Sequence, residues 1–312
     1  MYHRVSTSGS AGAGWGNRSL SVDIADFDRQ IRVLSERQNC LSVPEVIDRM
    51  VEGQLPGKAL TITFDDGYRD NLDHALPVLE RWSVPATIYV CTGLVDAARP
   101  PWWVELEALV ASLDEIAVDL GSERLVRTLS SDWDRFVAFQ KIADQGRRGD
   151  PATFQRIMAQ VRDQAPEIAE MTNPMLSWEE VRRLDAHPLI TIGAHTVTHP
   201  PLARLSDSEV IGELEEGKKR LEHELGHPVV HLAYPFGEVE QVGVREVRLA
   251  EAVGFRSAFT TRAGHLCRSH AGHLRALPRL MVAHDDSMLD LEWKCSGLQH
   301  LIGRRGRRLV TL

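Results

Sequence analysis

The chain has 312 residues, with 36 Lys or Arg against 44 Asp or Glu, so its formal net charge is −8 at pH 7. An acidic chain of this kind is a poor candidate for nucleic-acid binding, which needs a basic surface. Hydrophobic residues make up 43% and charged residues 26%, which is typical of a globular protein and excludes disordered and fibrous classes. We find no signal-peptide or transmembrane pattern and no C-x-x-C pair among the four cysteines, so we expect free thiols and a cytoplasmic location.

The N-terminal part is expected to contain one short strand, one loop and two helices. The strand covers 2–5, and the loop covers 6–19, a stretch rich in Ser, Gly and Ala that is expected to be mobile. Asp23 can cap the first helix, and Pro44 suits the first turn of the second. The apolar positions of the first helix, at helical spacing, are Phe27, Ile31 and Leu34. Both segments are predicted to be amphipathic surface helices.

Further along the chain, strand patterns alternate with helical patterns. The expected strands are 59–64, 86–90, 190–193 and 229–233, and the expected helices are 71–82 and 206–225. Ser206 and Glu209 form a capping box for the last of these helices, and Gly226 ends it. This alternation predicts an α/β fold with a parallel sheet or barrel.

Residues 101–180 show no strand pattern and are interpreted as a helical insertion within a single domain, 1–312. Their amphipathic pieces are 102–113 and 133–142. The C-terminal tail, 300–312, is basic and is interpreted as a solvated helix end, with contact to an acidic partner or a membrane surface as the alternative.

Two groups of polar residues follow apolar strands and are candidates for a metal site. Asp65 and Asp66 come directly after 59–64, and adjacent carboxylates repel each other unless a cation joins them. His195 and His199 follow 190–193, and both imidazoles would face one side if the segment turned helically. One carboxylate and two imidazoles make a common catalytic zinc set, which leaves the second carboxylate free to act as a base. Taken alone, Asp-Asp-Gly is most often only a turn, and a histidine pair at this spacing is more often exposed than metal-binding.

These motifs resemble those of the polysaccharide deacetylases of carbohydrate esterase family 4. Residues 63–68 (Thr-Phe-Asp-Asp-Gly-Tyr) resemble the first family motif, 195–200 (His-Thr-Val-Thr-His-Pro) the second, and 233–237 (Ala-Tyr-Pro-Phe-Gly) a variant of the third. Further likeness includes the Tyr-His-Arg segment at 2–4, which marks a bacterial branch of the family, and the segment 277–280. The resemblance implies a distorted (β/α)7 barrel of the glycoside hydrolase/deacetylase type that holds a divalent metal, zinc above all.

The resemblance also implies roles for individual residues. Asp65 would be the general base, and Asp66, His195 and His199 would hold the metal. A backbone N–H near Phe236 would stabilise the oxyanion of the reaction.

Pro235 and Phe236 would form one wall of an acetyl pocket. Tyr234 would belong to the same wall, or else pack beside a tight proline turn.

The third motif departs from the family pattern. Ala233 stands where many relatives carry an Arg that pairs with the base, and Arg279 is the candidate to replace that charge unless it forms a peripheral ion pair. The general acid of relatives is a His on a late strand, and His284 is the nearest candidate.

Two other features have competing interpretations. The cluster of three His and one Cys over 265–273 matches no standard zinc spacing and is interpreted as a mobile loop rather than a second metal site. The pair Trp102 and Trp103 offers either a face for stacking a sugar or an anchor that pins the insertion to the barrel.

The expected function is a metal-dependent hydrolase of a non-peptide C–N bond, which removes acetyl groups, N-acetyl in particular, from a sugar or oligosaccharide in polysaccharide or glycoconjugate metabolism. One alternative is a catalytically silent barrel that binds a glycan or a protein partner. Another is a hydrolase of a different amide, because the same metal and base suit any planar carbonyl.

Overall fold

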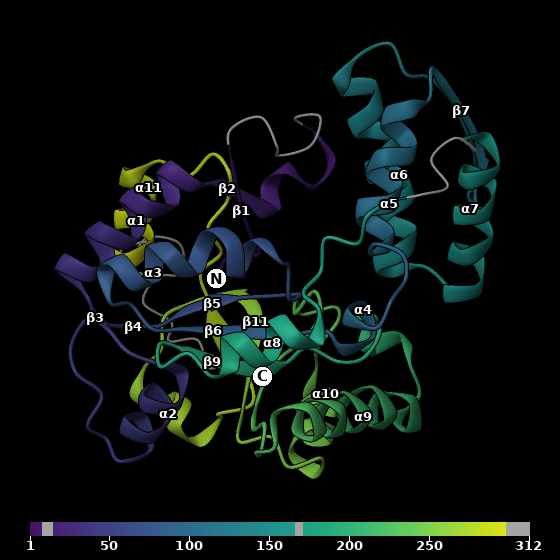
Figure 1. Ribbon diagram of the computed structural model, residues 1–312. Helices are drawn as coiled ribbons and strands as arrows, with labels where there is room; N and C mark the ends of the chain where they lie inside the picture. The colour runs from purple at the N-terminus through teal and green to yellow at the C-terminus, as the bar shows by residue number, and fades with distance from the viewer. Residues whose placement is uncertain (8–14, 166–170, 298–312) are drawn as a thin grey trace.

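The computed structural model describes residues 1–7, 15–165 and 171–297, and its centre is a curled parallel sheet (Figure 1). Six strands follow the order β12-β11-β10-β9-β6-β5. Their bounds are β5 (Ile62–Phe64), β6 (Ala86–Val90), β9 (Ile190–Ala194), β10 (His231–Ala233), β11 (Ser257–Ala263) and β12 (Leu277–Arg279). The predicted α/β barrel is therefore confirmed. The expected strands over 86–90, 190–193 and 229–233 lie in this sheet, whereas the one over 59–64 is divided between β5 and β4 (Ala59–Leu60), which pairs with β3 (Asn39–Cys40) outside it.

The N-terminal residues lie between the two edge strands of this sheet. The Tyr2 N–H donates to the Thr63 carbonyl at 2.8 Å, while the Val282 N–H donates to the Met1 carbonyl at 3.0 Å. Met1 and Tyr2 thus bridge β5 and the chain just after β12. They occupy a seventh position between the two edge strands of the sheet.

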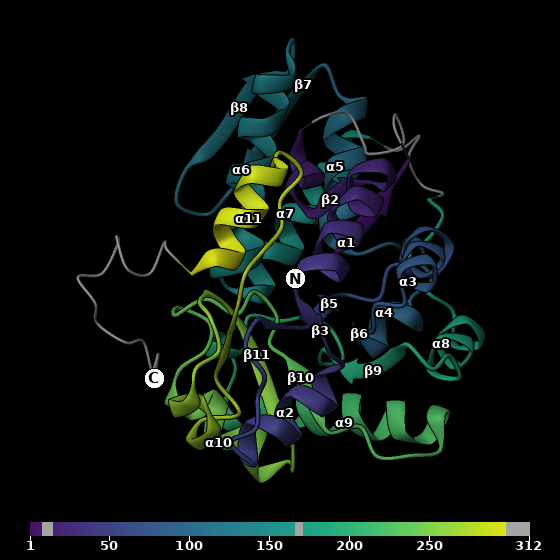
Figure 2. The ribbon, with the colours of Figure 1, turned by 90° about the vertical axis from the view of Figure 1, so that its left-hand side faces the viewer.

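Helices cover the outer face of the sheet and bury the main hydrophobic core against it. They are α1 (Ile24–Arg37), α3 (Leu76–Trp82), α8 (Trp178–Asp185), α9 (Asp207–Leu225) and α10 (Val244–Ala252). By contrast, α2 (Val43–Val51) packs Val43 and Ile47 against Tyr89 and Phe259 on the other side of the sheet. Figure 2 shows α2 and α9 at the same end of the molecule.

The predicted helix ends are confirmed by their capping contacts. The Asp23 side chain accepts a hydrogen bond from the Ala25 N–H, and Ser206 and Glu209 form the expected capping box. Gly226 ends α9 with φ 77°, a left-handed conformation that favours glycine. The expected helix over 71–82 begins as a π-helical turn, η2 (Asn71–Ala75), before α3.

The expected loop over 6–19 is more structured than predicted where the structure describes it. The strand β1 (Arg4–Ser6) pairs in parallel with β2 (Ser21–Asp23), and a 3₁₀ helix, η1 (Gly16–Leu20), precedes β2. Trp15 is buried and packs edge-on against Phe139 of the insertion. The Ser- and Gly-rich composition concealed this one large anchoring side chain.

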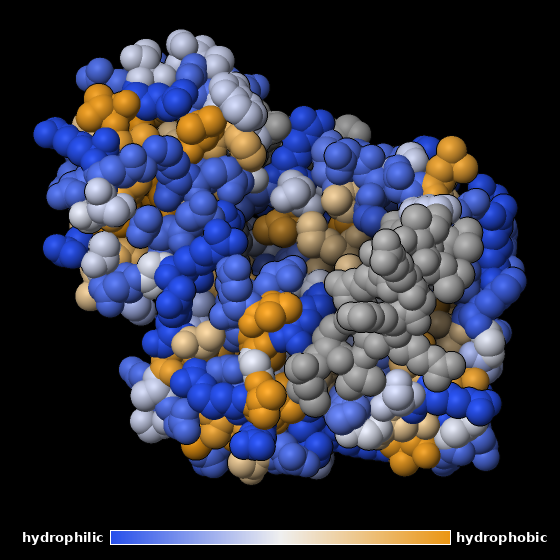
Figure 3. Space-filling model, turned by 180° about the vertical axis from the view of Figure 1, so that it is seen from behind, coloured by the Kyte–Doolittle hydropathy of each residue, from blue (hydrophilic) through white to orange (hydrophobic). Residues whose placement is uncertain are grey.

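The insertion contains a β-hairpin as well as helices, so the prediction of a purely helical segment was wrong in this respect. Its elements are α5 (Trp102–Ser112), β7 (Glu115–Asp119), β8 (Arg124–Thr128), α6 (Asp132–Arg148) and α7 (Pro151–Gln164). They enclose a separate hydrophobic core that includes Leu106, Phe139 and Ile157. The insertion forms a lobe beside the barrel, and its outer surface is mainly hydrophilic (Figures 1 and 3).

Short elements complete the chain: β3 (Asn39–Cys40), β4 (Ala59–Leu60), α4 (Thr92–Val95), η4 (Leu202–Arg204), η5 (Arg268–Gly272) and α11 (Met288–Ser296). All four cysteines are free thiols, as expected. Within the described ranges, no helix has the length and apolar character needed to span a bilayer. The basic tail, 300–312, lies outside the described residues.

Candidate metal centre and active site

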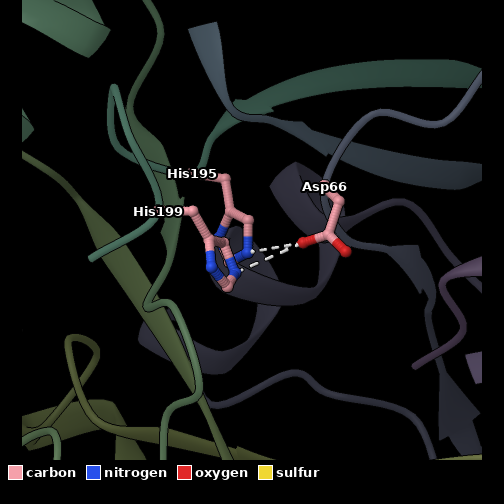
Figure 4. A group of neighbouring side chains, drawn as sticks. All are labelled: Asp66, His195 and His199. Carbon is pink, nitrogen blue, oxygen red and sulfur yellow. Dashed lines mark ion pairs between the residues drawn. The ribbon is translucent and has the colours of Figure 1, made fainter. Parts of the chain in front are cut away.

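Asp66, His195 and His199 converge at the carboxyl ends of two sheet strands (Figure 4). Asp66 follows β5, and both histidines follow β9. The Nε2 atoms of His195 and His199 lie 3.3 Å and 3.4 Å from Asp66 Oδ1. All three side chains are buried, and their ligand atoms lie within 4.8 Å of one another. This is the arrangement that the sequence predicted for a metal ion.

The segment that carries the two histidines is an irregular loop, not a helical turn. Thr196 and His199 have φ values of 66° and 59°, which is unusual for residues other than glycine. The loop is held by Glu213 of α9, whose carboxylate accepts hydrogen bonds from the N–H groups of Val197 at 2.8 Å and Thr198 at 2.9 Å. Both imidazoles therefore face one side for a reason other than helical spacing.

The donor set fits a divalent cation. His195 Nδ1 lies 2.7 Å from the Ala233 carbonyl and donates to it, which directs the lone pair of Nε2 toward Asp66. Burial lowers the pKa of His199 to about 4, so this imidazole is neutral at pH 7. Burial also acts to lower the pKa of His195. The nearby carboxylates of Asp66 and Asp65 outweigh burial, so the pKa of His195 is raised. The two carboxylates therefore stabilise positive charge at this point, and the buried Asp66 Oδ1 has no hydrogen-bond donor among the described residues.

Asp65 forms a buried, bidentate ion pair with Arg279. Nη1 of Arg279 lies 2.7 Å from Asp65 Oδ1, and Nη2 lies 2.7 Å from Oδ2. Burial alone would raise the pKa of Asp65, but the Arg279 charge outweighs burial and holds that pKa well below its usual range. The structure therefore places Arg279 on Asp65, as proposed from the sequence, and not in a peripheral ion pair. Asp65 is ionised and able to accept a proton.

The residues of the third motif, 233–237, lie partly beside the candidate metal site and partly in the hydrophobic core. The Phe236 ring lies 4.8 Å from the His199 ring, and Phe236 has φ 60°. Its N–H donates to no acceptor among the described residues, as an oxyanion donor requires. Tyr234, in contrast, is fully buried in the main core, and its hydroxyl donates to the Arg275 carbonyl at 3.0 Å. The alternative interpretation of Tyr234 as a packing residue is the one the structure supports, while Pro235 is buried between the two.

His3 is buried near the two aspartates, and the sequence argument did not single it out. Its pKa is lowered by burial, and the charges of Asp66 and Asp65 act on it in the opposite direction. The backbone of His3 is fixed by the side chain of Asn71, which donates to its carbonyl at 2.9 Å. In contrast, His284 lies in a turn after β12, and no described hydrogen bond, ion pair or ring contact joins it to the metal ligands. The signal for His3 was its place in the Tyr-His-Arg segment.

Trp103 is a second residue of the site, and it comes from the insertion. Its ring lies 4.9 Å from the His199 ring, whereas the Trp102 ring packs on Phe154 at 4.9 Å. The anchoring interpretation of this pair is therefore the better one.

The cluster over 265–273 forms no second metal site within the described residues, where the group at Asp66 is the only one found. It includes a 3₁₀ turn in which Cys267 Sγ lies 3.1 Å from Nδ1 of the buried His270.

Solved structures of known proteins share the fold of this chain. PplD, a deacetylase of Streptococcus pyogenes solved with acetate, superposes with a TM-score of 0.62 at 19% identity over 95% of this chain and 96% of its own. IcaB from Ammonifex degensii gives 0.60 at 19% identity, covering 94% of each chain. At this identity the likeness shows the fold.

Curated relatives match only a segment of the chain. YxkH of Bacillus subtilis (strain 168) is 34% identical over 92 residues, 29% of this chain and 30% of YxkH. The poly-beta-1,6-N-acetyl-D-glucosamine N-deacetylase of Staphylococcus aureus (strain MSSA476) is 30% identical over 79 residues, 25% of this chain and 27% of that protein. The matches thus span less than a third of these relatives.

The family match is broader and covers more than half of the chain. The family model for polysaccharide deacetylase matches residues 52–122 and 146–257. The part between these ranges lies in the insertion. The chain belongs to the polysaccharide deacetylase family.

Proposed function

We propose that the protein is a metal-dependent hydrolase that removes N-acetyl groups from a sugar of a polysaccharide or glycoconjugate. The observation that carries this proposal is the buried Asp65–Arg279 pair beside the group of Asp66, His195 and His199. It combines a proton acceptor with a cation site, the two parts that amide hydrolysis needs. The name of the Staphylococcus aureus relative supports an N-acetylglucosamine polymer as the substrate class.

Asp66, His195 and His199 would hold the ion, which we propose to be zinc because two imidazoles and one carboxylate are typical zinc ligands. A bound divalent ion supplies Lewis-acid activation of water and of the acetyl carbonyl. The protein contributes orientation: the Ala233 carbonyl fixes His195, and Glu213 fixes the loop between the two histidines.

Asp65 accepts the proton of the attacking water in this proposal. Arg279 keeps Asp65 ionised, so the carboxylate is ready at neutral pH. The Phe236 N–H donates a hydrogen bond to the developing oxyanion, and the Phe236 ring with Pro235 borders the acetyl group. His3 is the proposed acid: because burial lowers its pKa, it would first take up the proton that Asp65 removes from water and then pass it to the leaving amine. We therefore propose His3, not His284, as the acid.

The test is acetate release from N-acetylglucosamine oligomers by zinc-loaded protein, compared with Asp65→Asn. The variant should bind zinc as wild type does and lose nearly all turnover, because it keeps the ligands and lacks the base. Zinc binding without acetate release from any acetylated sugar would instead favour a different amide substrate. Absence of zinc binding would favour a silent barrel that binds a glycan or protein. The cytoplasmic location stays a prediction.

A further inference from the structure

Trp103 contacts both of the loops that carry the metal ligands. Its indole Nε1 donates a hydrogen bond of 2.6 Å to the Tyr68 hydroxyl, and Tyr68 lies two residues after Asp66. Its ring lies 4.9 Å from the ring of His199 at an angle of 53°. Trp103 is 6% exposed and lies in the first turn of α5, so the insertion supplies a side chain that joins the ends of β5 and β9.

His199 needs such a contact more than His195 does. The second ring nitrogen of a metal-binding histidine is normally held by a hydrogen bond, as His195 Nδ1 is held by the Ala233 carbonyl. His199 Nδ1 is buried and has no partner among the described residues. Three rings surround its imidazole instead: Trp103 at 4.9 Å, His195 at 4.9 Å and Phe236 at 4.8 Å. The orientation of His199 therefore depends on ring packing.

Trp103 is itself rigidly held. The side-chain amide of Asn17 donates to its carbonyl at 2.7 Å, and its indole N–H donates to the Tyr68 hydroxyl at 2.6 Å. Its partner Tyr68 is fully buried, with the Arg4 guanidinium 4.8 Å from the centre of its ring. A ring held by contacts on several sides can fix the imidazole that it touches.

We propose that Trp103 is a positioning residue for the metal centre, which aligns His199 with Asp66, so that the insertion completes the metal site. The proposal rests on the function above, since it concerns the same three ligands. It adds a specific dependence: metal affinity should respond to a side chain that is not a ligand and that belongs to the insertion.

The experiment is a calorimetric zinc titration of metal-stripped wild type, Trp103→Leu and Trp102→Leu. Trp102 is the matched control, because it shares the helical turn and the residue type but packs on Phe154, meets Trp103 only edge-on at 5.4 Å and makes no ring contact with His199 among the described residues. We expect Trp103→Leu to lower zinc affinity by about tenfold or more, the effect of losing a partner that orients a ligand, and Trp102→Leu to leave it within about twofold. Equal affinities for the two variants would overturn the proposal. If wild type itself binds no zinc, the proposed function fails together with it.

Two further variants separate ring contact from hydrogen bonding. Trp103→Phe keeps a ring against His199 and should recover most of the affinity lost in Trp103→Leu. Tyr68→Phe removes the same hydrogen bond as Trp103→Phe, so the double variant should be no weaker than either single one. The visible spectrum of the cobalt(II)-loaded protein should shift in Trp103→Leu and not in Trp102→Leu. An unchanged spectrum would show that Trp103 does not set ligand geometry and would also overturn the proposal.

Discussion

The guanidinium of Arg279 forms two hydrogen bonds of 2.7 Å with the carboxylate of Asp65, although the two residues belong to strands at opposite edges of the sheet. Arg279 is also held by the Thr260 carbonyl at 3.0 Å. The place that the family pattern gives to an Arg is filled here by Ala233, which packs with Tyr89 and Phe259. The same charge thus reaches the base from a different strand.

Replacing Arg279 with Met should raise the pKa of Asp65, because burial then acts without an opposing charge. At pH 7 we expect turnover to fall by about 100-fold, and the acidic limb of the kcat/KM profile to move to higher pH. Stability should also fall by about 3–5 kcal/mol where Asp65 stays ionised, since a buried charge has lost its partner. A pH–rate profile of the Arg279→Met variant measures the shift of the acidic limb. Arg279→Lys, which keeps the charge, should shift the limb less; an unmoved limb in the Met variant would contradict the role of Arg279.

Replacing Glu213 with Ala should weaken metal binding without removing a ligand. Its carboxylate accepts three hydrogen bonds from Val197 and Thr198, including one of 2.6 Å from the Thr198 hydroxyl. Loss of these bonds frees the loop between the two histidines, so we expect zinc affinity to drop by about tenfold. Calorimetry of metal-stripped protein measures this. Glu216→Ala, an exposed position on the same helix, is the control, and the prediction is wrong if the two variants bind zinc equally well.

The three side chains of the candidate metal site were predictable because each belongs to a short motif at the end of an apolar strand. Parallel strands bring their carboxyl ends to one edge, so Asp66 and His195 meet without knowledge of the loops between them. The pairing of Arg279 with Asp65 was only one of two possibilities, because the sequence around Arg279 does not show whether its side chain reaches the base or forms an ion pair at the periphery. The sequence marked Trp103 as one of a candidate pair and His3 as part of the Tyr-His-Arg segment, but it could not show which site residues they approach, because those contacts join segments distant in the chain.

Other errors had a local signal. Residues 115–119 (Glu-Ile-Ala-Val-Asp) alternate between exposed and buried, and this period of two indicates a strand. Helical patterns on both sides masked it. The burial of Trp15 was hidden by the Ser- and Gly-rich sequence around it, and its partner Phe139 lies in a separate lobe. The hydroxyl of Tyr234 points to the Arg275 carbonyl, a direction that the motif alone does not encode.

Stability of the metal-free protein should depend on the protonation of His231. This side chain is 4% exposed and bonds the Ser257 hydroxyl, and burial lowers its pKa to about 4. The unfolded chain, with a histidine pKa near 6.5, binds the proton first, so stability falls as pH drops from about 6.5 to about 4, by about 3 kcal/mol for this group. Urea unfolding across this range should show a shallower pH dependence for His231→Gln. The exposed His223→Gln should follow wild type, and equal slopes for all three proteins would refute the assignment.

The choice between His3 and His284 as the general acid can be decided by two matched substitutions. If His3 is the acid proposed above, His3→Gln should lower kcat by about 100-fold, remove the alkaline limb of the pH–rate profile and leave zinc affinity unchanged. His284→Gln should keep kcat within about twofold, because no described contact links it to the site. A substrate with a better leaving group should restore turnover in His3→Gln, since it needs less protonation. If His284→Gln shows the larger loss instead, the acid reaches the site from the turn after β12 and not from the N-terminal segment.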